Sequence, residues 1–308
     1  MLNMSENTDF LYPLSFTPRI VFDWFPNTIH AGVLAAKKNG LYEEAGLDVE
    51  IEGQVHHVMD PSETDMICGP EISMLANMDQ GIPLIGIAQF TQKCDSGLVS
   101  LKEAGITRMK DLEGKRLSNW DLPWFHPVMK YLVEEVGGDY SKVAKVQMDV
   151  EDIVSTLGKT CDATWVYENW EKYALLAAGK EVNYINFGDL DPIFNFCAPA
   201  IAATGNAAEN KGDALRRFLK VTDLSYRAMA EHPEKILEVK DMIPEASGDE
   251  MLLRGAEHLS SIWCDKDGKW GRIKPEMWNR MADFLVSQKV ISKRREREFT
   301  NDFFEEKQ

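Results

Sequence analysis

The chain has 308 residues, of which 44% are hydrophobic, and it carries a formal net charge of −16. This much apolar material can form a sizeable core, and the length exceeds that of one ordinary domain, which favours two lobes. The negative charge argues against nucleic acid or an anionic membrane surface as a partner, because both would repel the protein.

The sequence contains no continuous apolar run of about 18 residues, so we expect no direct membrane insertion. The first residues, MLNMSENTDFLYPLSF, lack a basic segment followed by an apolar one. We therefore expect a cytoplasmic protein if the sequence is complete as written, and an extracytoplasmic one, periplasmic or lipid-anchored, if a leader was removed. The five cysteines are widely spaced with no CxxC pair, which predicts buried free thiols and no metal site.

The segment from Arg19 to Glu52 has the pattern of a strand, a helix and a second strand. A short apolar run ends at Phe22, Thr28 can cap the helix, and Gly40 ends it. Apolar and acidic residues then alternate up to Glu52, which is the period of a strand. The segment therefore predicts a βαβ crossover.

Strand and helix patterns alternate through the rest of the chain. Strands are expected at 64–69, 82–90, 115–119, 145–148, 163–166, 182–186 and 197–204, with helices at 70–79, 127–136, 150–157 and 168–178. Helical patterns follow at 213–231, 233–239, 250–263 and 275–288. This order predicts an α/β fold of two lobes, with hinge crossings near 100–102 and 198–200 and a helical C-terminal tail that returns to the first lobe. We expect lobe one at 18–101 plus 198–308 and lobe two at 102–197.

Polar and aromatic residues follow four of the expected strands, two in each lobe. Ligands bind beyond the carboxyl ends of strands in open parallel sheets, so closure of the lobes would bring these four corners together. Aromatic planes can sandwich a flat ring, and carboxylates can accept hydrogen bonds from its amino group. The alternative is a structural role as turn formers or core, which we expect for two of the four aromatic candidates. The candidate ligand-binding residues are Asp23, Trp24, Asn27, His30, Glu71, Trp120, Trp124, Tyr167 and Glu168.

Motifs for catalysis are missing from the sequence. GxSxG, HExxH, GxxxxGK[ST] and a GxGxxG after a strand do not occur, so we expect no catalytic residue and no cofactor. His56 and His57 are adjacent, and neighbouring residues on a strand point to opposite faces, which favours surface positions over a shared metal ion.

The run Asp23–His30, DWFPNTIH, followed by AKKNGLYEEAGLDVEI, resembles the thiamin-pyrimidine branch of the type 2 periplasmic binding proteins. The resemblance continues through Asp65–Leu84, Met109–Leu117 and Trp165–Glu171. This branch includes the formylaminopyrimidine-binding proteins of ABC importers and the fungal pyrimidine synthases, beside more distant sulfonate binders. The resemblance implies a clamshell of two α/β lobes. The segment from Asp48 to Asp65 is shorter than this family leads us to expect.

The resemblance also implies a function. We expect a solute-binding protein that captures a thiamin-pyrimidine precursor, or a similar aminated heteroaromatic, between its lobes for an ABC importer whose permease is its partner. The synthases carry a lysine that takes pyridoxal phosphate and a histidine one turn later, and these places hold Gly69 and Ser73 when the chains are aligned on Asp65–Met66. Without the lysine no Schiff base can form, which favours a reversible binder. The alternatives are an enzyme of thiamin-pyrimidine biosynthesis and a cytosolic ligand sensor on the same fold.

Overall fold

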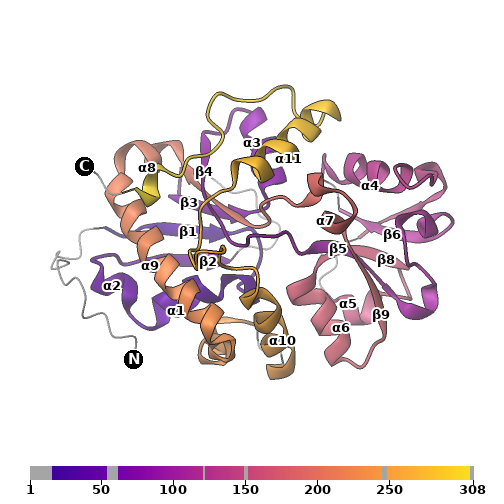
Figure 1. The fold of residues 1–308 in the computed structure, drawn as a ribbon, viewed down its shortest axis with the longest axis horizontal. Helices are drawn as coiled ribbons and strands as arrows, with labels where there is room; N and C mark the ends of the chain where they lie inside the picture. The colour runs from indigo at the N-terminus through magenta and orange to yellow at the C-terminus, as the bar shows by residue number, and fades with distance from the viewer. Residues whose placement is uncertain (1–15, 54–61, 121, 149–151, 245–247, 306–308) are drawn as a thin grey trace.

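A computed structural model describes residues 16–53, 62–120, 122–148, 152–244 and 248–305. Its two five-stranded sheets lie in two lobes, at the left and right of Figure 1. The first sheet has the order β2 (Glu50–Gly53), β1 (Arg19–Phe22), β3 (Met66–Gly69), β10 (Ala200–Thr204), β4 (Leu84–Gln89). The second has the order β7 (Ala144–Gln147), β6 (Arg116–Asn119), β8 (Ala163–Tyr167), β5 (Ser96–Leu101), β9 (Val182–Asn186). The predicted two-lobed α/β fold is confirmed.

The predicted crossover unit opens the first sheet. Strands β1 and β2 pair in parallel, and the chain between them forms η1 (Thr28–His30), α1 (Ala31–Lys38) and α2 (Leu41–Glu44). Gly40 ends α1 with a φ of 71°, a conformation that glycine adopts without strain. The cap at the start differs from the prediction, because Asn27 and not Thr28 accepts a hydrogen bond through its side chain, from the Ile29 N–H at 3.1 Å.

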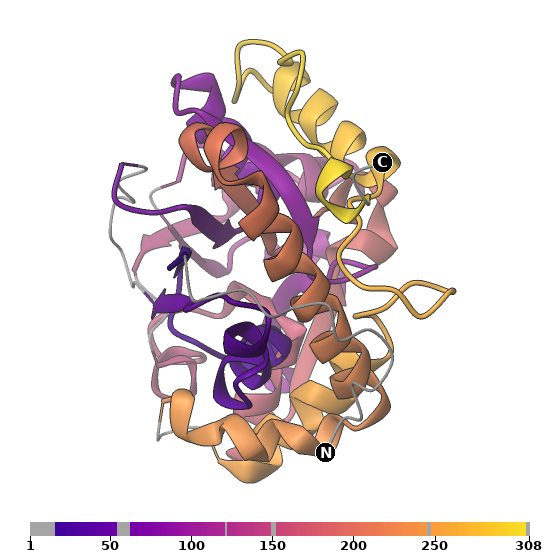
Figure 2. The ribbon, with the colours of Figure 1, turned by 90° about the vertical axis from the view of Figure 1, so that its left-hand side faces the viewer.

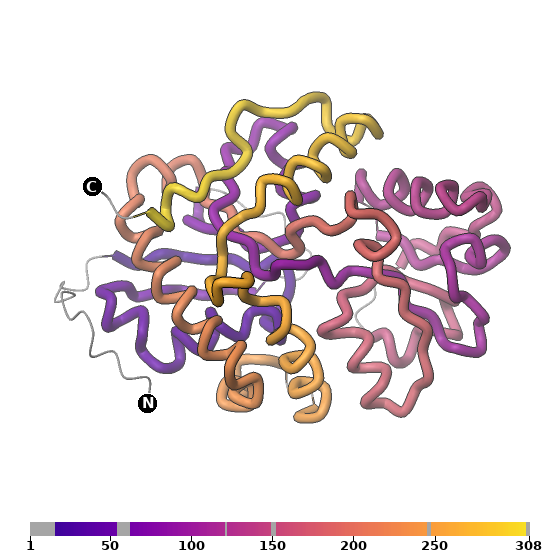
Figure 3. The backbone as a smooth tube through the Cα atoms, viewed as in Figure 1, coloured from indigo at the N-terminus to yellow at the C-terminus, as the bar shows by residue number. Residues whose placement is uncertain are grey.

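Two crossings join the lobes, and the chain can be followed through both in Figure 3. Strand β5 pairs with β8 and β9 in the second sheet, whereas the predicted boundary at 101 assigned these residues to lobe one. Because Ser96 and Ser100 interrupt its apolar pattern, this strand has no clear signal in the sequence. We propose lobes of 16–89 plus 200–305 and of 96–194, joined by crossings at 90–95 and 195–199.

The C-terminal helices return to lobe one, as the sequence predicts. Helix α9 (Gly212–Glu231) packs along α1, as Figure 2 shows, and the rings of Tyr42 and Phe218 stack with centroids 5.2 Å apart. Helix α10 (Asp249–Ser260) lies between α9 and the second lobe, and α11 (Pro275–Ser287) covers α3 (Glu71–Asp79). Lobe one is therefore built from both ends of the chain.

An apolar contact region continues from one lobe to the other. Phe284 of α11 meets Tyr131 of α4 (Phe125–Glu134) at 5.2 Å between ring centroids. It also meets Phe194, just before the second crossing, at 5.3 Å. Both lobes therefore share one buried cluster on this side of the molecule.

Short segments complete the fold. They are η2 (Lys102–Ala104), η3 (Met109–Leu112), η4 (Tyr140–Lys142), α5 (Ile153–Thr156), the π-helical η5 (Glu168–Lys172), α6 (Tyr173–Ala177), α7 (Phe187–Leu190), η6 (Pro192–Phe194), α8 (Gly205–Asn210), η7 (Pro233–Met242) and η8 (Asp302–Phe304). Within the described ranges, no helix has the length and apolar character needed to span a bilayer. His56, His57 and the rest of residues 54–61, half of the short segment between Asp48 and Asp65, lie outside these ranges.

Candidate functional site

The four predicted corners meet between the lobes. Strands β1 and β3 are parallel neighbours in one sheet, as are β6 and β8 in the other, so the corners of each pair lie at one sheet edge. Two contacts join the edges. The Trp124 Nε1–H donates to Ser73 Oγ at 3.2 Å, and the rings of Phe25 and Trp170 approach to 5.5 Å. Residues that follow all four strands thus surround one interlobe region.

The four aromatic candidates differ in their exposure. Trp24, Trp120 and Tyr167 are half-buried, so part of each ring faces open space. Trp124 is 2% exposed and packs against Trp165 at 5.2 Å, which makes it core. Burial raises the pKa of Tyr167 well above its ordinary value, and the nearby Cys94 and Asp23 raise it further. The Asp23 carboxylate therefore affects the pKa of Tyr167 although the two residues belong to opposite lobes.

Two half-buried carboxyl groups accompany these rings. Burial raises the pKa of Asp23 to about 7, although its backbone hydrogen bond lowers it in part. Burial likewise raises the pKa of Glu171 to about 7, offset by the Tyr167 N–H, which donates to Glu171 Oε2 at 3.0 Å. A group with such a pKa gains by ionising against a positively charged or hydrogen-donating ligand.

The absence of a side chain at Gly69 leaves space for the Asp23 carboxylate. A Cβ added at Gly69 would lie 3.0 Å from Asp23 Oδ2, so a larger side chain here would displace the carboxylate. The resemblance to the pyrimidine synthases implies that their lysine stands at this position. The end of β3 is thus shaped around Asp23.

Asn27 and His30 have structural roles at the corner that follows β1. Asn27 caps η1, and its N–H donates to His30 Nδ1 at 3.2 Å, which completes a capping box. The His30 ring is buried, stacks on Phe22 at 3.9 Å and lies 3.6 Å from Cys68 Sγ. Burial lowers its pKa to about 3, so the imidazole is neutral at physiological pH. Neither side chain is open to a ligand in this conformation.

Glu71 contacts the second crossing. It is 0% exposed, its N–H donates to the Cys197 carbonyl at 2.8 Å, and its Oε2 accepts from the Cys197 N–H at 2.9 Å. Burial raises the pKa of Glu71 well above the ordinary range, offset in part by hydrogen bonds from the backbone and side chain of Cys197 to the carboxyl group. Glu71 thus lies against the second crossing, whereas Glu171 lies beside Tyr167.

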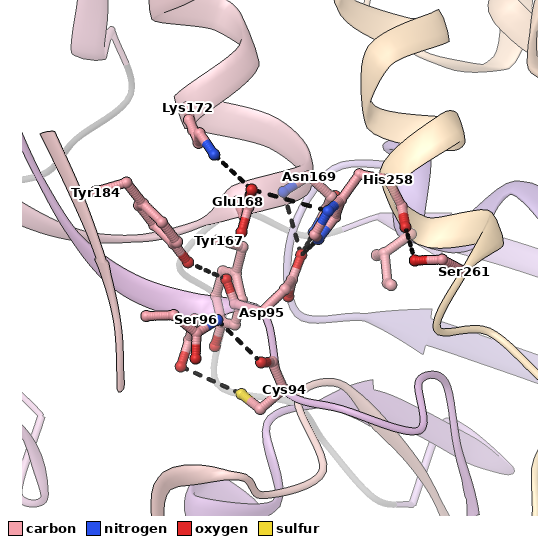
Figure 4. Close-up of polar contacts among 12 residues, drawn as sticks. Cys94, Asp95, Ser96, Tyr167, Glu168, Asn169, Lys172, Tyr184, His258 and Ser261 are labelled. Carbon is pink, nitrogen blue, oxygen red and sulfur yellow. Dashed lines mark hydrogen bonds and ion pairs between the residues drawn. The ribbon is translucent and has the colours of Figure 1, made fainter. Parts of the chain in front are cut away.

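Glu168 lies beside a cavity at the first crossing, with a volume of about 310 Å³. Residues of both lobes line it, including Asp95, Glu168 and Tyr184 from lobe two or its crossing and His258 from α10. Figure 4 shows Lys172 bonded to Glu168, and His258 reaching towards both Glu168 and Asp95. Glu168 thus points to this cavity and forms a pair with Lys172.

Sequence reasoning did not select Glu171, Asp95 or His258. Glu171 lies in the Trp165–Glu171 motif, and its spacing of four residues from Tyr167 was the available signal. The π-helical turn of η5 returns its carboxylate to the Tyr167 N–H. Asp95 and His258 carried no signal, since their meeting depends on tertiary structure.

The described residues offer little support for a metal site or a reactive thiol. Among the described residues, no group of three or more His, Cys, Asp or Glu side chains is placed to hold a metal ion. Four cysteines are buried, and Cys264 is half-buried. Burial raises the pKa of Cys94 to about 12, which keeps that thiol protonated.

Residues 27–236 match the family model described as NMT1/THI5 like. The chain belongs to this family. A formylaminopyrimidine-binding protein of Halalkalibacterium halodurans is 24% identical over 287 residues, covering 87% of this chain and 84% of that protein. A 4-amino-5-hydroxymethyl-2-methylpyrimidine phosphate synthase of Legionella pneumophila is 22% identical, covering 82% of this chain and 83% of its own length.

Solved structures share the fold. The ligand-binding component of an ABC-type import system from Staphylococcus aureus superposes with a TM-score of 0.70 at 11% identity, covering 95% of this chain and 97% of that one. The alkanesulfonate-binding protein SsuA from Xanthomonas axonopodis pv. citri gives 0.66 at 13% identity, covering 90% and 94%. The predicted resemblance and the clamshell fold of this NMT1/THI5-like chain are confirmed.

Proposed function

We propose that this NMT1/THI5-like protein is a solute-binding protein that captures a thiamin-pyrimidine precursor, or a similar aminated heteroaromatic, by closure of its two lobes. The observation that carries the proposal is the pairing of half-buried aromatic rings with two carboxyl groups, Asp23 and Glu171, that come from opposite lobes. Flat rings stack on the aromatic side chains, amino groups donate to the carboxylates, and a carboxyl group that keeps its proton can donate to a ring nitrogen. Such a ligand stabilises the closed state because it contacts both lobes.

Delivery to an ABC importer extends this proposal, with the importer's permease as the partner of an extracytoplasmic protein. It is supported by the formylaminopyrimidine-binding relative and by a fold shared with binding components of ABC systems. In this reading, the ligand is handed over unchanged when the lobes reopen.

A synthase is the second candidate, since one relative of comparable coverage bears that name. Its chemistry needs a lysine for pyridoxal phosphate, and the corresponding position holds Gly69, packed against Asp23. Incubation with pyridoxal phosphate followed by borohydride reduction and peptide mass spectrometry separates the two functions. We expect no adduct on a lysine of the site, and a stoichiometric adduct there would overturn the binder.

The ligand is tested by calorimetry and tryptophan fluorescence with hydroxymethylpyrimidine, formylaminopyrimidine, thiamin, riboflavin, taurine and nitrate. We expect the aminopyrimidines to bind and to quench fluorescence, because Trp24 and Trp120 border the site. Stabilisation by taurine or nitrate alone would refute the argument from acidic and aromatic residues.

A further inference from the structure

Asp95, on the first crossing, anchors the segment that carries the proposed ligand contacts of lobe two. Its backbone carbonyl accepts the Glu168 N–H at 2.9 Å and the Tyr184 hydroxyl. Its Oδ2 accepts both the Asn169 N–H at 3.1 Å and the Asn169 side-chain amide at 2.7 Å. Tyr167 and Glu171 flank these two anchored residues, so their placement depends on Asp95.

The same carboxylate meets a side chain from the other lobe. Asp95 is 1% exposed, and its Oδ1 has no hydrogen-bond partner. His258 of α10 brings Nε2 to 3.8 Å from Asp95 Oδ2 and Nδ1 to 3.8 Å from Glu168 Oε1 (Figure 4). One imidazole from lobe one thus stands between two carboxylates of lobe two and its crossing.

The surrounding backbone holds α10 close to this point. A Cβ on Gly255 would come within 2.4 Å of the Asn169 carbonyl, so only glycine allows α10 to approach η5 this closely. Asn169 is itself held by Asp95. The helix, the anchored segment and the crossing therefore form one continuous contact between the lobes.

We propose that Asp95 is a positioning residue that sets the ligand-binding segment Tyr167–Glu171, and that the side chain of His258 docks on it to favour lobe closure. This inference rests on the proposed function for its ligand readout. A closure that changes the contacts of Asp95 also moves Tyr167 and Glu171, so the crossing connects lobe position to ligand affinity.

Charged and polar groups from several elements surround His258. Facing or neighbouring groups are Asp95 on the crossing, Glu168 and Lys172 on η5, Tyr173 on α6, Tyr184 on β9, Lys93 and Asp189 at the cavity, and Arg254 and Glu257 on α10 itself. Lys172 pairs with Glu168 and Lys93 with Asp189, and among the described residues around this cavity His258 is the side chain that approaches Asp95 from lobe one. A closed state that holds this contact is stabilised by it, so removal of either side chain favours the open state.

The test uses small-angle X-ray scattering of the ligand-free protein and calorimetry with formylaminopyrimidine. Four variants are compared: Asp95→Asn, Asp95→Ala, His258→Gln and the control His232→Gln, which removes an exposed histidine paired with Glu234. We expect the wild type and the control to have the same radius of gyration, and both Asp95→Asn and His258→Gln to have a larger one because the contact between the lobes is weakened.

The affinities test positioning separately. We expect Asp95→Ala to weaken ligand binding by about tenfold or more, as for lost hydrogen bonds to a charged group, and Asp95→Asn to recover much of this loss because its amide oxygen still accepts from Asn169. A radius of gyration equal to that of the wild type in both Asp95→Asn and His258→Gln would overturn the docking of His258. Equal affinities in Asp95→Ala and wild type would overturn positioning. If Asp95→Ala does not fold, Asn169→Ala, which removes the side-chain amide that donates to Asp95 Oδ2 at 2.7 Å, replaces it in the affinity measurement, and an unchanged affinity would overturn positioning. Failure of the wild type to bind any aminopyrimidine would refute the proposed function, and the scattering would still test the docking.

Discussion

Replacement of Glu171 by Gln is expected to stabilise the ligand-free protein at high pH and to weaken its ligand. An ordinary glutamate has a pKa of 4.5, and burial raises that of Glu171 to about 7. The folded state therefore holds a proton that the unfolded state releases, and the free energy of unfolding falls as pH rises from about 4.5 to about 7. The difference corresponds to about 3 kcal/mol, which we reduce to about 1–2 kcal/mol because solvent screens a half-buried group.

Glutamine keeps the acceptor for the Tyr167 N–H and removes the ionisation. We expect Glu171→Gln to exceed the wild type by this amount in urea unfolding at about pH 8 and to match it at about pH 4. The variant also lacks the charged acceptor for an amino group, so its affinity for an aminopyrimidine should fall by about 1.5–3 kcal/mol, roughly tenfold to a hundredfold. Glu103→Gln, an exposed change in η2, is the matched control.

The two measurements separate a binding residue from a structural one. A residue retained for binding can be locally unfavourable for folding, so its replacement raises stability while function declines. Lower stability at high pH together with an unchanged dissociation constant would show that Glu171 supports the fold, and the reasoning from its burial would be refuted.

Three further outcomes follow from the first corner. Asn27→Ala should lower the free energy of unfolding by about 1 kcal/mol through loss of the cap and leave saturated ligand binding intact; weaker binding at unchanged stability would restore the predicted ligand contact. His30 should show no NMR titration above about pH 5, because burial lowers its pKa to about 3; stability linked to this group is lost as pH falls below the ordinary histidine range, and a midpoint near neutrality would contradict its burial. Gly69→Ala should cost about 1–3 kcal/mol by crowding Asp23, measured by thermal or urea unfolding, and a neutral effect would show that the carboxylate moves freely.

The crossover from β1 to β2 and the polar corner at Asp23 were predictable because their signals are local. Apolar periodicity, a helix cap and Gly40 each influence the backbone conformation of residues close to them in the sequence. These local preferences do not require tertiary contacts. The strands that end before Trp120 and Tyr167 have the same kind of signal. Their parallel pairing places the corners at common sheet edges without any further information.

The environment of each side chain depends on contacts between residues that are far apart in the sequence, and local sequence patterns do not reveal these contacts. Glu71 looked like a ligand contact from its place at a strand end, but Cys197, 126 residues later, accepts and donates its hydrogen bonds. Strand β5 was missed because its serines interrupt the apolar pattern of a buried strand. Its partners β8 and β9, which bury it, come much later in the chain.

The sequence alone determined an α/β chain with aromatic and acidic residues at four strand ends, since periodicity and turn residues act locally. Only the tertiary structure separated Glu171, half-buried beside Tyr167, from Glu71, which is buried against the second crossing. It also brought His258 to Asp95. Burial and charge pairing depend on neighbours distant in the chain, and these neighbours determine which carboxylate can meet a ligand.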